Sequence, residues 1–126
     1  MRHQVSGFKL GRSTGQRKAM QRTMIRQLFD HERIETTRAK ALFIRGAAEK
    51  MITLARNSAK GTEVEKVNAR RLAAARLGGG ADMVKKLFDD IAPRFADRNG
   101  GYTRMFRLGL RQGDAAEMVL LELVEE

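Results

Sequence analysis

Hydrophobic residues recur at helical spacing in four stretches of the chain and alternate as in strands in three shorter ones. In the first stretch, Met20, Met24 and Leu28 recur every four residues, which predicts the buried face of a helix ending near Phe29. The third stretch, 62–77, is rich in alanine and arginine and only weakly amphipathic, so we expect much of that helix to be exposed. The two other helices have clear apolar faces, formed by Ala41, Ile44, Ala48, Met51, Ile52 and Ala55 and by Met83, Val84, Leu87, Phe88 and Ile91.

Polar residues, glycines and one proline mark where these helices begin and end. Ser13 with Gln16, and Thr62 with Glu65, have the spacing of a capping box, in which two side chains satisfy free amides of the first turn. The other expected boundaries are Thr37 as the cap of a second helix over about 38–58, the triple glycine 78–80 as the end of the third, Asp82 as the cap of the fourth and Pro93 as its end.

Three short segments have the composition of strands. Residues 33–37 alternate and include β-branched side chains, residues 102–108 alternate after a glycine turn, and residues 118–124 are mostly apolar. Gly109 and the Gly113-Asp114 pair predict a hairpin-like connection between the last two. The chain of 126 residues is therefore expected to form a single α+β domain over 1–126, with about four helices and three strands in the order α-β-α-α-α-β-β.

Charge is distributed unevenly along this pattern. The formal net charge is +10 and the isoelectric point is near 10.8, which favours a polyanionic partner. Residues 1–29 contain basic side chains and no acidic one, whereas every charged residue after Arg111 is acidic. We expect residues 1–12, with little apolar periodicity, to form an extended arm that becomes ordered only on a partner.

Catalytic and metal chemistry lacks the necessary residues. The chain has no cysteine, and its two histidines, His3 and His31, are too far apart in the sequence to form a metal site by spacing or to supply the parts of a nucleophilic triad. Asp89-Asp90 is interpreted as a charged helix face, and the triple glycine is not followed by the Lys-Ser/Thr of a phosphate-binding loop. We therefore expect no enzyme activity and no cofactor. No apolar run reaches the length of a membrane span and no secretory signal is recognised, so we expect a cytoplasmic protein.

Nucleic-acid binding fits better, and the scatter of basic residues over several elements and an arm favours folded RNA over DNA. Tyr102 follows a glycine pair and precedes Arg104, so its ring is either an ordinary aromatic at the start of a strand or a stacking partner for a base. The side chains assigned to RNA binding are Arg2, His3, Lys9, Arg12, Arg17, Lys18, Arg22, Arg26, Arg38, Lys40, Arg94, Arg98, Tyr102, Arg104, Arg107 and Arg111.

Several segments, taken together in order and spacing, resemble the bacterial large-subunit ribosomal protein L17 family. The most specific match is Lys86-Leu87-Phe88, Ile91-Ala92-Pro93-Arg94 and then 98–104, with Arg111, Gly113-Asp114 and 122–124 after it. In the first half of the chain the matching residues are Met1-Arg2-His3, Ser6-Gly7, 10–12, Arg17, Ala19-Met20, Arg22, 34–37, Lys40-Ala41 and 52–55. Residues 37–42 lack the proline and glutamate associated with that position in the family, and helix 62–77 with its glycine linker is atypical.

This resemblance implies a two-layer fold, with helices packed on a small three-stranded mixed sheet. It also implies a structural protein of the large subunit of a bacterial-type ribosome, docked on ribosomal RNA near the polypeptide exit, with neighbouring ribosomal proteins as partners and no cofactor. The alternative from another class is a free nucleoid-type or regulatory nucleic-acid-binding protein. The acidic C-terminal strand would face a protein neighbour or solvent.

Overall fold

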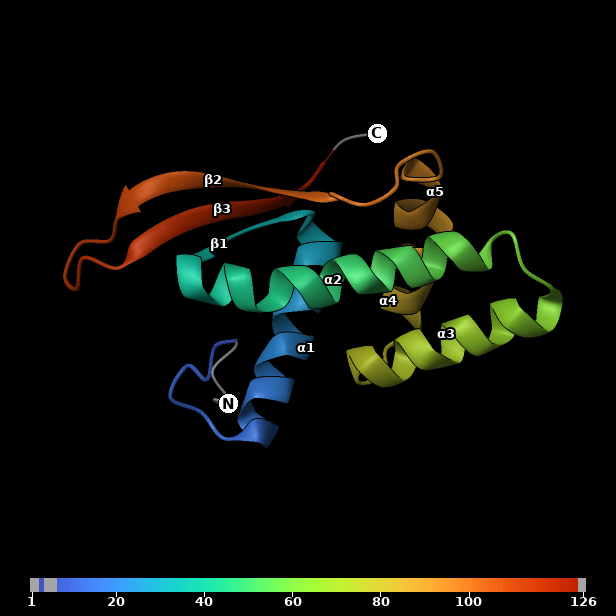
Figure 1. Cartoon of the computed structure of the whole chain (residues 1–126), viewed down its shortest axis with the longest axis horizontal. Coiled ribbons are helices and arrows are strands. Elements are labelled where there is room, and N and C mark those ends of the chain that lie inside the picture. Colours follow the sequence, from blue (N-terminus) through green and yellow to red (C-terminus); the bar gives the residue numbers. More distant parts are fainter. Residues whose placement is uncertain (1–2, 4–6, 125–126) are drawn as a thin grey trace.

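The computed structural model describes residue 3 and residues 7–124, and its elements follow the predicted order (Figure 1). The elements are α1 (Thr14–His31), β1 (Arg33–Thr37), α2 (Arg38–Ser58), α3 (Glu63–Leu77), α4 (Ala81–Lys86), the π-helical segment η1 (Leu87–Ile91), α5 (Ala92–Arg94), β2 (Thr103–Leu110) and β3 (Glu117–Leu123). The predicted α+β class is confirmed. Two parts of the predicted arm lie outside the described residues: residues 1–2, which include Arg2, and residues 4–6.

The three strands form one sheet in the order β1-β3-β2, and both pairings are antiparallel. The expectation of a mixed sheet is wrong, because a mixed sheet needs at least one parallel pair of strands. β1 and β2 run in the same direction, but β3 lies between them, so no two parallel strands are hydrogen-bonded. Val119, Leu121 and Leu123 alternate along β3 and are buried, which means that one face of the sheet covers the core and the other faces outward.

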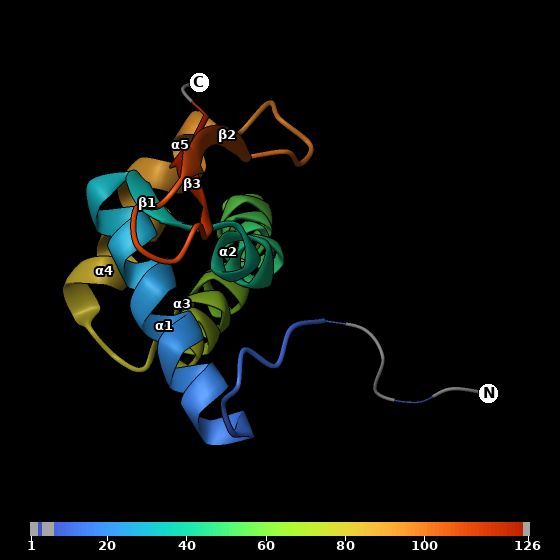
Figure 2. The same ribbon diagram turned by 90° about the vertical axis from the view of Figure 1, so that its left-hand side faces the viewer.

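The helices lie together on one face of the sheet (Figures 1 and 2). α1 and α2 contact both β1 and β3, while α3 contacts α1, α2 and α4. Leu28 and Phe29 of α1, Ile44 of α2 and Leu121 of β3 have no exposed surface and join the two layers in one core. As predicted, α3 is largely exposed, and it buries only Ala69, Ala73 and Leu77.

The predicted capping box is complete at α1, whereas at α3 only one of its two bonds is present, from the amide of Glu65 to the Thr62 hydroxyl at 3.3 Å. The Ser13 hydroxyl accepts from the amide of Gln16 at 3.3 Å, and the Gln16 side chain accepts from the amide of Ser13 at 3.1 Å. Thr37 does precede α2, but its side chain makes no capping hydrogen bond. Gly80, not Asp82, is the residue before α4; Asp82 lies in the first turn, where its negative charge is favourable beside the helix N-terminus.

The predicted fourth helix is continuous in space but not uniform. Its middle turn, η1, is π-helical, and the amide of Ala92 donates to the carbonyl of Leu87 five residues earlier. Pro93 lies inside α5 and does not end the helix at that residue, as we had expected. Because a proline cannot donate to the carbonyl four residues back, here that of Asp89, the wider turn before Pro93 accommodates its ring.

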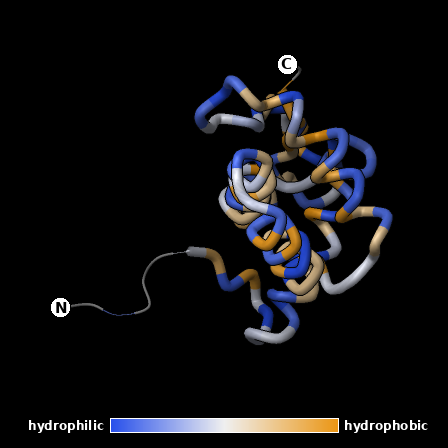
Figure 3. The backbone as a smooth tube through the Cα atoms, turned by 90° about the vertical axis from the view of Figure 1, so that its right-hand side faces the viewer, coloured by the Kyte–Doolittle hydropathy of each residue, from blue (hydrophilic) through white to orange (hydrophobic). Residues whose placement is uncertain are grey.

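The last two strands form a hairpin, with bounds shifted slightly from the predicted 102–108 and 118–124. β2 contains a bulge, because Arg107 pairs with Val119 while Gly109 pairs with the next residue, Met118. Gly109 has a φ of 102°, which side chains rarely adopt and which explains a glycine at this point. The hairpin extends beyond the start of α2 (Figure 1). A hydrophilic loop between α5 and β2 projects from the opposite end (Figure 3).

Candidate nucleic-acid interface

An open groove of about 450 Å³ lies between α1, α2 and α3, and every charged residue that lines it is basic. Its cations are Lys18 and Arg22 of α1, Lys50 of α2 and Arg76 of α3; we call this set the basic groove. Within the described part of the chain, none of these four lies within 4.0 Å of a carboxylate. Apolar side chains, among them Ile25 and Met51, line the rest of the groove. The groove is therefore a concentration of uncompensated positive charge.

The sequence places these cations beside the core. Lys18 and Arg22 are one turn apart on α1 and so project from the same side of the helix. Lys50 precedes buried Met51, and Arg76 precedes Leu77, which has no exposed surface. Each cation is thus attached to a segment whose backbone is fixed by a buried neighbour, so little backbone entropy has to be lost when a ligand binds.

The triple glycine after α3 allows α1 to lie close to the chain at that point. Gly78 and Gly80 have φ values of 78° and 88°, in the region that favours glycine. A methyl group at Gly78 would lie 3.3 Å from the Arg22 side chain, and one at Gly80 would lie 2.9 Å from the guanidinium of Arg26. The sequence analysis treated this segment as a linker; the structure adds that it leaves room for two arginines of α1.

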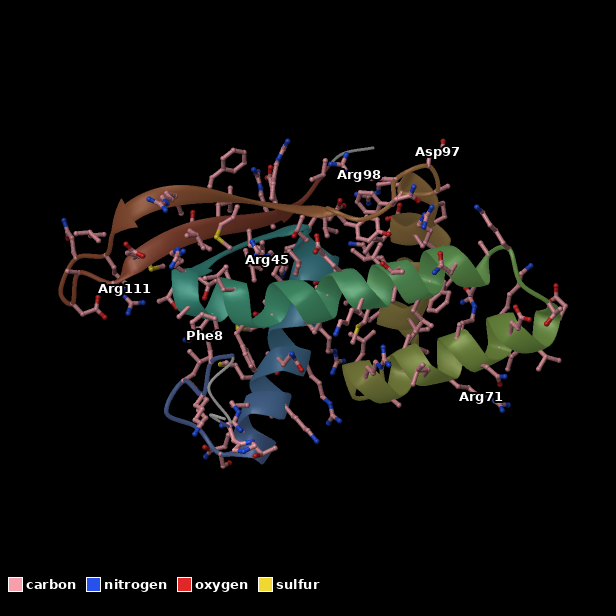
Figure 4. The ribbon with its side chains drawn as sticks, viewed as in Figure 1. Phe8, Arg45, Arg71, Asp97, Arg98 and Arg111 are labelled. Carbon is pink, nitrogen blue, oxygen red and sulfur yellow. The ribbon has the colours of Figure 1, made fainter. Side chains whose placement is uncertain are left out.

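The described part of the N-terminal arm, residues 7–12, runs beside α1 and the start of α2 (Figures 1 and 2). Phe8 and Lys9 line an open hollow of about 950 Å³ together with Leu42 and Phe43 of α2, and Phe8 points toward α2 in Figure 4. Arg12 and Arg17 donate to backbone carbonyls of Leu10 and Arg12 at 2.8 and 2.7 Å. These bonds fix the guanidinium groups without neutralising them. His3 is exposed.

Three of the arginines assigned to RNA binding already have carboxylate partners. Arg94 donates to Glu32 and to Asp90, Arg104 donates to Glu122, and Arg111 lies 2.6 Å from Asp114. The hydrogen bond from Arg94 lowers the pKa of Glu32, and that from Arg111 lowers the pKa of Asp114 to about 2. A phosphate would have to compete with these carboxylates, which makes the three arginines weaker candidates than the basic groove.

The burial of Tyr102 leaves its ring no free face for a base and favours the alternative of an ordinary aromatic at a strand start. Its side chain is 1% exposed and its ring centre lies 5.0 Å from that of Phe95. The tyrosine hydroxyl accepts a hydrogen bond from Thr53 of α2 at 3.2 Å. Sequence alone left both possibilities open because the strand faces α2 only in the folded chain.

The other predicted cations do not converge on one place. Arg98 donates to the carbonyl of Gly101 at 3.1 Å in the loop before β2, at the far end from the hairpin in Figure 4. Arg38 and Arg107 lie together where α2 begins beneath the hairpin. In the described residues, these three cations, Arg26 and Lys40 have no carboxylate within 4.0 Å.

Two other features, a metal site and a membrane-spanning helix, are absent from the described residues. No group of three or more His, Cys, Asp or Glu side chains is placed to hold a metal ion. No helix there is both long enough and apolar enough to cross a membrane.

Comparison with known proteins identifies the family. The family model described as ribosomal protein L17 matches residues 20–124. The chain belongs to the ribosomal protein L17 family. A large ribosomal subunit protein bL17 from Trichlorobacter lovleyi is 52% identical over 126 residues, all of this chain and 95% of its own length. Relatives of the same name from Symbiobacterium thermophilum, 53% identical over 92% of this chain and 96% of theirs, and Pelobacter propionicus, 50% identical over 100% and 93%, match similarly.

Membership of the L17 family confirms the resemblance seen in the sequence and the prediction of a ribosomal protein that is not an enzyme. Sequence analysis missed Lys50 and Arg76 as candidate residues. The available signal was that each directly precedes a residue of a buried face. Nothing in the one-dimensional pattern showed that α1, α2 and α3 meet, so these two cations could not be grouped with Lys18 and Arg22.

Proposed function

We propose that this L17-family chain is a structural constituent of the large ribosomal subunit that braces ribosomal RNA through its basic groove and N-terminal arm. The observation that carries the proposal is the convergence of four cations from three helices, with no carboxylate among the residues that line the groove. Such a site attracts the phosphates of a nucleic acid, because no carboxylate lining the groove competes for its cations.

Bracing follows from how the groove is built. α1, α2 and α3 are joined through one core, so the distances between their cations are set by packing and not by the ligand. Arg22 and Arg76 can each donate two hydrogen bonds to the oxygens of one phosphate, while Lys18 and Lys50 act as point charges. RNA segments that fold into an irregular surface can place several phosphates at such fixed positions, whereas the described residues include no helix-turn-helix pair for reading bases in a DNA groove.

The arm extends this contact along the RNA. Lys9 and Arg12 lie in residues 7–12, and Arg2 and His3 precede them in an acid-free segment. Arg26, Arg38, Lys40, Arg98 and Arg107 are assigned to further phosphates around the molecule, and Arg94, Arg104 and Arg111 contribute only where RNA competes with their carboxylate partners.

The position within the subunit is proposed to be near the polypeptide exit, beside neighbouring ribosomal proteins, in the cytoplasm of a bacterium. Support comes from the family resemblance and from relatives that are bacterial large-subunit proteins. Cross-linking of Lys9 to RNA in intact subunits, followed by sequencing of the linked nucleotides, tests this position. Links confined to RNA distant from the exit would contradict it.

Sedimentation after a moderate-salt wash tests the function itself. We expect the full chain to remain with large subunits and to be absent from bulk DNA, where the alternative of a nucleoid-type protein would place it. Removing residues 2–12 is expected to leave the thermal unfolding transition nearly unchanged and to reduce occupancy in the subunit severely, because the segment is basic and its described part, residues 7–12, contains no buried residue. Occupancy equal to that of the full chain would refute the role of the arm.

A further inference from the structure

The β2–β3 hairpin carries apolar surface that phosphate binding does not explain. Phe106, Leu108 and Leu110 of β2 are 48%, 49% and 67% exposed. The aliphatic side chains of Leu108 and Leu110 gain nothing from a phosphate, and all three apolar side chains lose free energy while they remain in water. Three such residues within five positions of one strand indicate a surface that becomes covered.

The backbone of β2 also lacks a neighbouring strand along one side. β2 is an edge strand, because the sheet order is β1-β3-β2. The carbonyl of Tyr102 accepts from Val124 at 2.8 Å, so the even-numbered residues before the bulge direct their backbone groups toward β3. Met105 and Arg107 then direct theirs toward the open edge. The amide of Thr103 follows this alternation, since it donates away from β3 to Glu49 at 3.2 Å.

The hairpin holds this surface in a fixed shape without any partner. The amide of Arg111 donates to the carbonyl of Ala116 at 2.8 Å, and that of Ala115 returns to the carbonyl of Arg111 at 3.0 Å. The ion pair between Arg111 and Asp114 crosses the same turn. A rigid projecting hairpin loses little entropy when a partner binds to it.

A small pocket lies beside the hairpin, near its turn. It has a volume of about 90 Å³, and Leu110, Met118 and Val119 form its apolar part. Arg38 and Arg107 stand at its border and, among the described residues, have no carboxylate within 4.0 Å. Glu117 also lines the pocket without pairing with either of them. This pocket suits one aliphatic side chain with an acidic side chain beside it.

We propose that the open edge of β2 binds an extended segment of another protein, in which apolar residues alternate with acidic ones. The segment adds a fourth strand through the backbone groups of Met105 and Arg107, covers Phe106, Leu108 and Leu110, and places carboxylates against the two free arginines. A second copy of this chain is a poor occupant, because β2 contains no acidic residue that could pair with the free Arg107 of the other copy.

The experiment uses the full chain assembled into large subunits, and in that respect it rests on the proposed function. A photo-reactive benzoylphenylalanine replaces Leu110 in one variant and Val64 in another. Val64 is a matched control, since it is 69% exposed but lies on α3 away from the hairpin. After irradiation, linked peptides are identified by mass spectrometry and linked RNA by reverse transcription. Assembly of each variant is measured first, by sedimentation with large subunits.

We expect the Leu110 variant to link to a segment of a different protein with aspartate or glutamate beside the linked residue, and the Val64 variant to give no such link. Links from Leu110 only to RNA, only to another copy of this chain, only to a peptide without carboxylates, or no link at all would overturn the proposal while leaving the proposed function intact. If the unmodified chain sediments with large subunits but the Leu110 variant does not, the hairpin is needed for assembly. In that case the proposal requires that Leu110→Asp also fails to sediment with large subunits and that Val64→Asp does not fail. Failure of the unmodified chain itself would refute both.

Discussion

Neutralising half of the basic groove gives the sharpest test of how this protein holds RNA. The double variant Lys50→Gln/Arg76→Gln removes one cation from α2 and one from α3 while retaining long polar side chains. The matched control, Lys60→Gln/Arg71→Gln, removes the same residue types and the same net charge outside the groove. Arg71 points away from the body of the protein in Figure 4.

The expected magnitude follows from the number of charges removed. Each phosphate contacted contributes a slope of roughly −0.7 to −0.9 to the dependence of log K on log salt, so the groove variant should lose about 1.4–1.8 from the slope. At fixed salt, an exposed charge pair contributes up to about 1 kcal/mol, so two of them weaken binding by at most roughly 2 kcal/mol, a factor of about 30. The control should change the slope by far less, because its charges lie outside the site.

Filter binding of the purified variants to large-subunit ribosomal RNA, repeated over a range of salt concentrations, measures both quantities. Thermal unfolding of each variant checks that the fold is retained, which we expect because neither residue is buried. Equal changes of slope in the groove variant and the control would show that the RNA senses only net charge. That result would refute the groove as a specific binding site and would show that RNA binds to the basic surface as a whole.

Three further predictions concern the contacts that hold the fold. Tyr102→Phe should lower the free energy of unfolding by about 1 kcal/mol through loss of the Thr53 hydrogen bond and leave RNA affinity unchanged; weaker RNA binding at unchanged stability would restore a role in recognition. Glu32→Gln should lower stability by about 1 kcal/mol at pH 7, a figure reduced for solvent exposure. Because Arg94 lowers the pKa of Glu32 in the folded state, this contribution is present above the ordinary value of 4.5 and disappears as pH falls through the folded value, so melts of the two proteins should converge in acid; a constant difference would contradict it. Gly109→Ala should cost about 1–2 kcal/mol because its φ is 102°, and an unchanged melting temperature would show that the bulge can relax.

Local features of the sequence predicted the elements well. The capping box at Ser13 and the regular apolar spacing after it placed α1 within two residues at its far end, and the bounds of β1 and α2 agree with those predicted. These signals act between residues three or four apart, so one sequence contains them in full. The π-helical turn before Pro93 was missed because a proline inside a helical pattern predicts an end, whereas a wider turn also accommodates its ring.

Long-range pairings explain what could not be predicted about the site. Arg94 reaches Glu32 across 62 positions, and Arg104 reaches Glu122 across the sheet, so charge counts along the chain could not reveal which arginines are already neutralised. The same limit applies to the groove, since Lys50 and Arg76 meet only when α2 and α3 pack. Sequence therefore predicted that the protein binds a polyanion, and packing decided which cations are free to do so.

The central position of β3 has a consequence for the order in which this protein can be made. Its two partner strands are synthesised earlier and do not pair with each other, so the sheet has no hydrogen-bonded pair until residues 117–123 leave the ribosome. α1, α2 and α3 are complete well before that and can already pack on one another. A nascent chain that stops short of Glu117 therefore presents the basic groove without the hairpin, and RNA can engage the protein before its last surface exists.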